Sequence, residues 1–345
     1  MGVSKYAYVY ARIRARMCEL LDERRLKELV DARSTDFLPL LMDSAYKEKL
    51  TKEGLAAVNA GRIENALNEE LIDQYLMVIR STDGVIRDFF VELLRQLEVK
   101  NLKAVIRAKA TGNTAPATFF PVEKFFRRHI SKLTETDSLE SLIKRLDNPY
   151  RQVLEESLPE YEKSKRLFVL ENALDAELFG AIWHKTERLH VVDKEIARNI
   201  IGTEFDIVNV MTLLRCKSGG IAEAELTKYF LPYAYMLDFD AVNDSIYAEN
   251  MNSAIQLLPA PAYKDVLSDA YSVYEAEESL VPFENALRHY FFMLVKNTLR
   301  GYPINIGTTI GYLYLKELEI KNLSTIAVCK ENDLPVEETM KIVMM

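Results

Sequence analysis

Apolar residues recur along most of the chain with the period of an α-helix. Near the N-terminus they follow steps of four, three, four and three residues: Tyr6, Tyr10, Ile13, Met17 and Leu20. Residues at this spacing share one helix face. Residues 6–10 also alternate as a strand would, but the continuation through Leu20 and Leu21 favours a helix. Residues 101–109 show the same helical spacing, and no alternation of strand and helix patterns is present. We therefore predict an all-α fold.

Three motifs recur in the same order in three parts of the chain. The first begins with a tyrosine: Tyr46, Tyr150 and Tyr263. The second, Glu-Asn-Ala-Leu, begins at Glu64, Glu171 and Glu284. The third begins with an asparagine, Asn101, Asn209 or Asn322, and ends with a lysine, Lys109, Lys217 or Lys330. The copies of the second motif are 107 and 113 residues apart, and typical helical solenoid repeats are much shorter.

Each copy is therefore the size of a domain. We predict three tandem helical domains, which cover residues 1–115, 116–230 and 231–345. Glycine and proline residues at 112–116 and 218–220 supply the turns expected at the joins.

The repeated charged residues call for a physical account. A partly buried carboxylate is tolerated when it is paired, and such a pair can fix helix register. We expect each Glu-Asn-Ala-Leu glutamate to pair, within its own copy, with the lysine of the third motif or with the arginine two residues before that lysine. This arginine is Arg107 in the first copy and Arg215 in the second, whereas the third copy has Val328. General acid–base catalysis by the glutamates is disfavoured, because no histidine or second carboxylate accompanies them.

Charge and composition exclude several kinds of partner. The chain of 345 residues has a formal net charge of −8, which is the wrong sign for binding nucleic acid, and residues 231–345 hold 16 acidic and 8 basic groups. No glycine-rich phosphate-binding motif occurs, so we expect no nucleotide and no cofactor. Cys18, Cys216 and Cys329 lie far apart and indicate neither a disulfide framework nor a zinc site.

The chain is not expected to span a membrane. Arginines occupy the place where a secretory signal would be apolar, and the longest weakly polar run, residues 304–315, has 12 residues.

Two other functions fit part of the pattern. Asp238, Asp240 and Asp244 imitate a calcium-binding loop, although Asn243 stands where such a loop requires glycine. An all-α metal-dependent enzyme that uses these aspartates predicts a deep pocket with perturbed carboxylates in one copy only. An all-α scaffold or adaptor that binds peptides predicts a linear arrangement of domains.

The repeats resemble a known family. The pattern from Glu98 to Lys109, seen again from Glu319 to Lys330, is similar to the repeated signature of the C subunit of archaeal-type ATP synthases, the counterpart of the d subunit in vacuolar-type proton ATPases. The likeness extends to residues 10–15, to the Glu-Asn-Ala-Leu motifs and to residues 311–317. Asp206 replaces the glutamate in the middle copy.

This resemblance implies a non-catalytic rotor subunit of the central stalk. Family members are similar to a shallow funnel of three all-helical domains about a pseudo-threefold axis. The funnel lies on the cytoplasmic face of the membrane, seated on the proteolipid ring, and receives the foot of the rotor shaft. The implied partners are therefore the shaft subunits and the proteolipid ring. Arg12, Arg14 and Arg16 are our candidates for a surface that faces a partner, because three arginines within five residues exceed what solubility requires.

Overall fold

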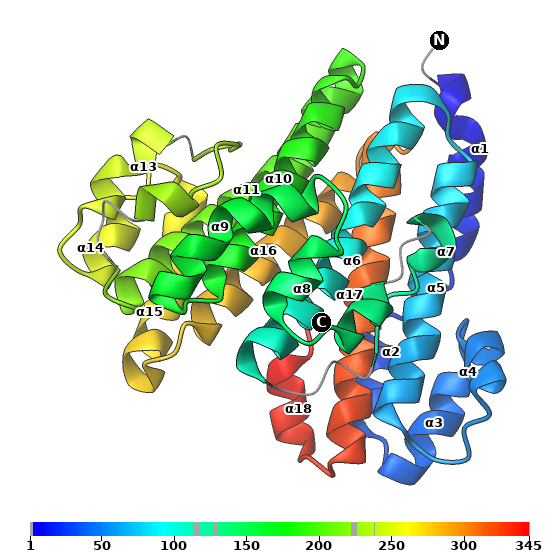
Figure 1. The fold of residues 1–345 in the computed structure, drawn as a ribbon. Helices are drawn as coiled ribbons and strands as arrows, with labels where there is room; N and C mark the ends of the chain where they lie inside the picture. Colours follow the sequence, from blue (N-terminus) through cyan, green and yellow to red (C-terminus); the bar gives the residue numbers. More distant parts are fainter. Residues whose placement is uncertain (1–2, 113–117, 127–129, 222–225, 238, 345) are drawn as a thin grey trace. The chain divides into compact units, whose positions relative to one another are not determined.

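The computed structural model describes residues 3–112, 118–126, 130–221, 226–237 and 239–344. Within these ranges the regular structure is helical and no strand occurs, so the predicted all-α fold is confirmed (Figure 1). The chain divides into two compact units, one of Met1–Glu156 with Pro303–Met345 and the other of Ser157–Tyr302. The three tandem domains remain a prediction.

The first unit contains most of the N-terminal helices and the last two: α1 (Val3–Met17), α2 (Glu23–Asp31), α3 (Ser34–Met42), α4 (Lys47–Glu53), α5 (Ala60–Arg80), α6 (Gly84–Thr111), α7 (Glu123–Phe126), the 3-10 helix η1 (Ile130–Glu135), α8 (Leu139–Lys144), α17 (Ile306–Glu331) and α18 (Val336–Ile342). Helix α9 (Tyr150–Ser164) begins in this unit and continues into the second. The second unit contains α10 (Phe168–Glu187), α11 (Val191–Ser218), the 3-10 helix η2 (Thr227–Tyr229), α13 (Phe239–Ile246), α14 (Met251–Gln256), α15 (Pro261–Glu277) and α16 (Val281–Thr298).

The first unit is built around α17, which lies along α5 and also contacts α1. Helix α1 buries Tyr6, Val9 and Ile13. The predicted N-terminal helix is therefore confirmed, but it ends at Met17, so Leu20 lies beyond it and not on its apolar face. The spacing between Tyr6 and Ile13 nevertheless matches a single buried stripe.

In the second unit, α15 and α16 pack against each other and α11 packs against α16. Their core contains the apolar positions next to the repeated motifs: Leu214, Tyr263, Leu267, Phe283 and Leu287. The repeated motifs therefore contribute apolar side chains to the buried contacts between helices. This burial explains why apolar residues recur in the copies beside the polar ones.

A glycine lets the chain approach α11 closely. A Cβ on Gly202 would lie 2.7 Å from the Cβ of Tyr235, closer than two such atoms can come. The absence of a side chain at Gly202 therefore allows the segment that contains Tyr235 to rest on the helix. This close approach places the backbone of Tyr235 and Met236 within reach of Asp206.

Candidate functional site

The three repeated lysines each donate a hydrogen bond to a backbone carbonyl of another copy. Lys109 Nζ lies 2.5 Å from the carbonyl of Thr136, and Lys217 Nζ lies 2.6 Å from that of Ala248. Lys330 Nζ lies 2.6 Å from the carbonyl of Val30. The first copy thus bonds to the second, the second to the third, and the third to the first.

The three repeated asparagines each hold a backbone residue further along the chain through two hydrogen bonds. Asn101 and Phe120 are joined at 2.7 and 3.0 Å, and Asn209 and Leu231 at 3.2 and 2.8 Å. In the third copy the same arrangement joins Asn322 to Met344, at 2.6 and 3.1 Å. In each case the side-chain Nδ2 of the asparagine donates to the backbone carbonyl, and the side-chain Oδ1 accepts from the backbone N–H of the same residue. A side-chain amide thus satisfies both backbone groups of one residue.

The expected pairing of each glutamate with the lysine of its own copy is not seen for Lys109 or Lys330, whose ammonium groups bind backbone carbonyls of other copies. Glu64 instead accepts a hydrogen bond from Thr118 Oγ1 at 2.8 Å. Glu284 pairs with Arg288 in the next turn of its helix, and Arg215 of the preceding copy lies 4.0 Å away. The glutamates are only half-buried, so solvent shares their charge and a strong internal partner is not required.

A buried carboxylate lies three residues before each repeated asparagine. Glu98 and Asp206 are 0% exposed and Glu319 is 5% exposed. Each accepts a hydrogen bond from the tyrosine that begins the first motif of another copy. The oxygen–oxygen distances are 3.1 Å for Tyr150 and Glu98, 3.0 Å for Tyr263 and Asp206, and 2.5 Å for Tyr46 and Glu319.

Our interpretation of the sequence overlooked these contacts, although both partners recur in all three copies. Burial raises the pKa of the tyrosines Tyr46, Tyr150 and Tyr263, and the neighbouring carboxylate raises it further. Each tyrosine is therefore a stable hydrogen-bond donor at neutral pH. The tyrosines and the lysines connect the copies in the same order, so the polar residues of the repeat serve contacts between copies.

The three buried carboxylates differ in charge compensation. Lys316 Nζ lies 2.9 Å from Glu319 and 4.2 Å from the centre of the Tyr46 ring. Arg95 lies at the same place in the first copy, 3.8 Å from Glu98. The middle copy has Thr203 at this position, and the part of the chain that the structure describes brings no basic group into ion-pair distance of Asp206.

Asp206 accepts two backbone N–H groups instead of facing a cation. The donors are Tyr235, at 2.9 Å, and Met236, at 2.8 Å. Burial raises the pKa of the Asp206 carboxyl, and these hydrogen bonds oppose the shift. In the middle copy, the shorter side chain of Asp206 and the close approach at Gly202 thus allow backbone N–H groups to replace the cation, while Asp206 still binds the equivalent tyrosine, Tyr263.

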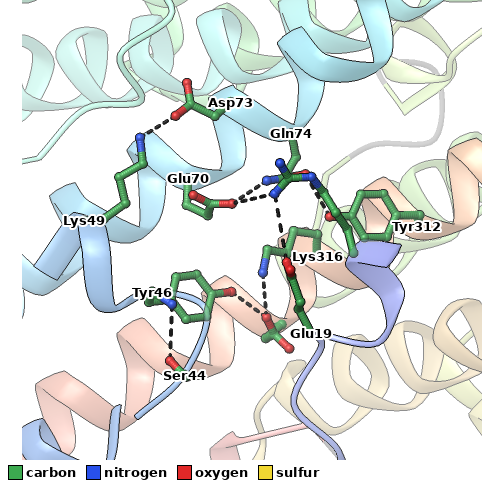
Figure 2. A network of polar contacts seen from close by, with 11 residues as sticks. Glu19, Ser44, Tyr46, Lys49, Glu70, Asp73, Gln74, Tyr312 and Lys316 are labelled. Carbon is green, nitrogen blue, oxygen red and sulfur yellow. Dashed lines mark hydrogen bonds and ion pairs between the residues drawn. The ribbon is translucent and has the colours of Figure 1, made fainter. Parts of the chain in front are cut away.

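Further polar residues surround Lys316 in the first unit (Figure 2). Gln74 accepts a hydrogen bond from Tyr312 Oη at 2.9 Å and donates one to Glu70. Burial raises the pKa of the Glu70 carboxyl, and the charge of Lys316 opposes the shift. The adjacent surface hollow of about 350 Å³ is lined by charged side chains that already pair with one another, including Lys49 with Asp73.

The metal-dependent enzyme receives no support from these residues. Raised carboxyl pKa values occur in two copies, at Glu70 and Asp206, and both groups are held by structural hydrogen bonds. Asp238 lies outside the described residues, and residues 239–246 form α13 instead of a calcium-binding loop. Among the residues that the structure describes, no group of three or more potential ligands could hold a metal ion.

Two of the three candidate partner-facing arginines have partners inside the chain. Arg12 donates to Ser81 Oγ at 3.2 Å and lies over the ring of Tyr8. Arg16 lies 4.0 Å from Glu19 and 3.8 Å from Glu70. Arg14 is exposed. Of the helices in the described ranges, none has the length and apolar character needed to cross a membrane.

The fold and the repeated contacts define a class of protein: an all-helical repeat protein whose buried polar residues join one copy of the repeat to another. Comparison with known proteins is consistent with this class. The ATP synthase (C/AC39) subunit family matches residues 9–342. The chain therefore belongs to the ATP synthase (C/AC39) subunit family. This membership confirms the resemblance drawn from the sequence and identifies a structural, non-catalytic subunit of an ATP synthase.

Relatives that match over most of their length are described as C subunits of A-type ATP synthases. The protein from Methanosphaera stadtmanae is 28% identical over 98% of this chain and 88% of its own length. The protein from Methanocaldococcus jannaschii is 29% identical over 100% of this chain and 87% of its own length. The protein from Methanothermobacter thermautotrophicus is 30% identical over 93% of this chain and 83% of its own length.

Proposed function

We propose that this chain is the central-stalk subunit that couples the rotor shaft of an A-type ATP synthase to the proteolipid ring in the membrane. It acts as a socket and performs no chemistry itself, and its contact with the ring holds it at the cytoplasmic face. The observation that carries this proposal is the order of the polar contacts, in which each copy holds the next and the third holds the first.

We further propose that residues 1–115, 116–230 and 231–345 are three domains arranged about a pseudo-threefold axis as a funnel. Head-to-tail contacts between like units produce a ring when the last contact returns to the first unit. The bonds from Lys330 to Val30 and from Tyr46 to Glu319 are the contacts that return from the third copy to the first. They therefore support a closed arrangement over a linear scaffold.

The chemistry of these contacts suits a part that transmits force. Each joint combines a buried carboxylate, a tyrosine and a lysine bound to a carbonyl, all of which lose their partners if the copies slide past each other. An unpaired buried polar group is costly, so sliding is resisted over short displacements. Close-packed interiors also deform little under load. Torque on one copy is thus passed to the others.

Reconstitution tests the proposal. The membrane ring, shaft and catalytic head are assembled with and without this subunit, and ATP hydrolysis and ion transport are measured in the same vesicles. We expect omission to leave hydrolysis active while ion transport is lost, and addition of the purified chain to restore coupling. An unchanged ratio of transport to hydrolysis after omission would refute the role in coupling.

A further inference from the structure

The contact between α17 and α5 in the first unit has an equivalent in the second unit, between α11 and α16. The repeated tyrosine and carboxylate hold both pairs. In the first pair Tyr46 bonds to Glu319 on α17, and in the second Tyr263 bonds to Asp206 on α11. The two helix pairs can therefore be compared position by position.

In the first unit, helix α1 lies on the pair formed by α17 and α5. It contacts α17, and its own apolar face is buried. Arg12 extends to the end of α5, where it donates to Ser81 Oγ at 3.2 Å. Arg16 lies 3.8 Å from Glu70 of α5. Residues 306–313, the N-terminal part of α17, are all buried. Helix α1 thus contributes to closing this surface to solvent.

The equivalent part of α11 is much more exposed. Residues 193–200 match residues 306–313 of α17, because both ranges begin 16 residues before the repeated asparagine. Of these residues in α11, two are buried, Ala197 and Ile200. Val192, one residue earlier, is 62% exposed. The surface that α1 covers in the first unit is therefore accessible in the second.

The accessible surface of α16 is more apolar than its counterpart on α5. The positions six, nine and ten residues after the motif glutamate are polar on α5 and aromatic or aliphatic on α16: Glu70, Asp73 and Gln74 against Tyr290, Met293 and Leu294. Tyr290 and Leu294 are half-buried, and Met293 is 36% exposed. Contact with water alone favours the opposite trend, so the apolar side chains indicate an interaction surface.

The apolar stripe of α16 begins in the core and continues beyond it. Phe283 and Leu287 are buried in the core of the second unit, and Tyr290 packs against this core. Tyr290 and Leu294 follow Leu287 by three and seven residues, so all of them share one helix face. A stripe that starts buried and emerges partly exposed is completed by an element outside this core.

We propose that this surface docks an amphipathic α-helix of another subunit of the synthase. We name it the α11–α16 surface and define it by Val192, Ile196, Asn199, Tyr290, Met293 and Leu294. The occupant is a helix because a helix, α1, lies on the equivalent surface of the first unit. The inference rests on the proposed function, since the partner belongs to the same complex.

The α11–α16 surface selects a helix with an uncharged docking face. On α1, Arg16 lies beside Glu70, whereas the second unit has Tyr290 at that position. An arginine docked there loses water without gaining a carboxylate, so α1 of a second copy does not suit this surface. Apolar side chains at positions i, i+3 and i+7, the spacing of the buried face of α1, do suit it. The six residues that define the surface carry no charge, so it offers nothing to an anionic lipid headgroup.

Charge substitution tests the contact. Leu294→Glu places a carboxylate in the middle of the α11–α16 surface, and Asn297→Glu places one at an exposed position of the next turn. Asn285→Glu is the matched control, because Asn285 is exposed on the opposite face of the same helix. Binding of each purified chain to the immobilised complex of shaft and ring subunits is measured by biolayer interferometry, and thermal unfolding is measured in parallel.

We expect Leu294→Glu to raise Kd at least about tenfold and Asn297→Glu about three- to tenfold, because docking removes each carboxylate from water. The Asn285→Glu chain should bind within about twofold of the unmodified chain. If Leu294→Glu lowers folding stability, Asn297→Glu still reports on docking, since its side chain is already exposed. Equal affinity of the Leu294→Glu, Asn297→Glu and unmodified chains would overturn the inference.

Photo-crosslinking in the assembled synthase identifies the occupant. Met293 is replaced by the photoreactive residue p-benzoylphenylalanine, the chain is reconstituted with ring, shaft and catalytic head, and the adducts are mapped by mass spectrometry. We expect an adduct on a helix of another subunit, at an apolar stripe with the stated spacing. An adduct with lipid, with a second copy of this chain or within the chain itself would overturn the proposal, as would the absence of any adduct.

The binding measurement separates failure of this inference from failure of the proposed function. If the unmodified chain does not bind the complex of shaft and ring, the proposed function fails and the inference fails with it. If the unmodified chain binds and couples while Leu294→Glu and Asn297→Glu have no effect, only the present inference fails.

Discussion

Replacing Lys316 with methionine removes the buried cation that faces Glu319. Lys316 is 2% exposed and its ammonium group contacts both the carboxylate and the Tyr46 ring. Removal of one partner of a buried ion pair costs about 3–5 kcal/mol, because the other charge remains buried. Methionine nearly preserves the volume, and Glu319 keeps its hydrogen bonds from Tyr46 and from the Leu21 N–H. We therefore expect a loss near the lower limit, about 3 kcal/mol.

The loss is measured by urea unfolding followed by far-UV circular dichroism, together with the melting temperature. For a folding unit of about 150–250 residues, each kcal/mol changes Tm by about 2–4 °C, so Lys316→Met should melt about 6–12 °C lower. Lys341→Met, an exposed change on α18, is the control and should stay within about 0.5 kcal/mol of the unmodified chain.

The double variant Lys316→Met with Glu319→Gln tests the cause of the loss. Once the carboxylate is neutral, the missing cation no longer leaves a buried charge, so the double variant should be about 1–3 kcal/mol more stable than the sum of the single changes predicts. A Lys316→Met chain as stable as the control would refute the reasoning that this ion pair holds the joint. Strictly additive losses would refute it as well.

Three further changes test the other contacts. Burial raises the Asp206 pKa above its ordinary value of 3.8, so the folded state binds the proton more tightly than the unfolded state does. Relative to the Asp206→Asn variant, the unmodified chain should therefore lose stability as pH rises from 3.8 through the folded pKa, with no further trend above it. Urea unfolding of both chains at several pH values measures this difference. The Asn209→Ala variant should lose about 2–4 kcal/mol of folding stability, because two buried backbone groups of Leu231 are left unpaired. The fluorescence of Trp183, in the same unit, follows the unfolding. The control Asn285→Ala changes an exposed side chain and should lose less than about 0.5 kcal/mol. The raised pKa of Tyr46 stabilises the folded chain below pH 10.0, and this contribution is lost as pH rises toward the folded pKa. The Tyr46→Phe variant should therefore be less stable than the unmodified chain at neutral pH. In unfolding curves measured at alkaline pH, the difference in stability should shrink above pH 10.0.

The helical fold was predictable because it depends on short-range patterns. The spacing between Tyr6 and Ile13 and the apolar face of residues 101–109 follow from the geometry of a single helix. The end of α1 was less predictable. Its apolar pattern continues to Leu20, but the helix stops at Met17, and the backbone of Leu21 instead reaches Glu319 on α17.

The polar contacts were predictable only as positions. Both Tyr46 and Glu319 recur in every copy, with aspartate in place of the glutamate in the middle one, yet they are separated by 273 residues, and nothing in the local sequence pairs them. We predicted that Glu64 and its equivalents pair with the repeated lysine or arginine of the same copy, because we expected each charge to be balanced within its own copy. The structure instead supplies the buried carboxylates with tyrosine donors from other copies.

By itself the amino-acid sequence determined that this protein is helical, that its polar motifs occur in triplicate and that it belongs with the C/AC39 subunits of ATP synthases. These properties reside in spacings within a helix and in residue identities along the chain. Only the tertiary structure decided that Lys109, Lys217 and Lys330 bind carbonyls and that tyrosines hold the buried carboxylates. The physical reason is burial: a carboxylate that loses water must find donors wherever folding brings them, and folding brings them from distant parts of the chain.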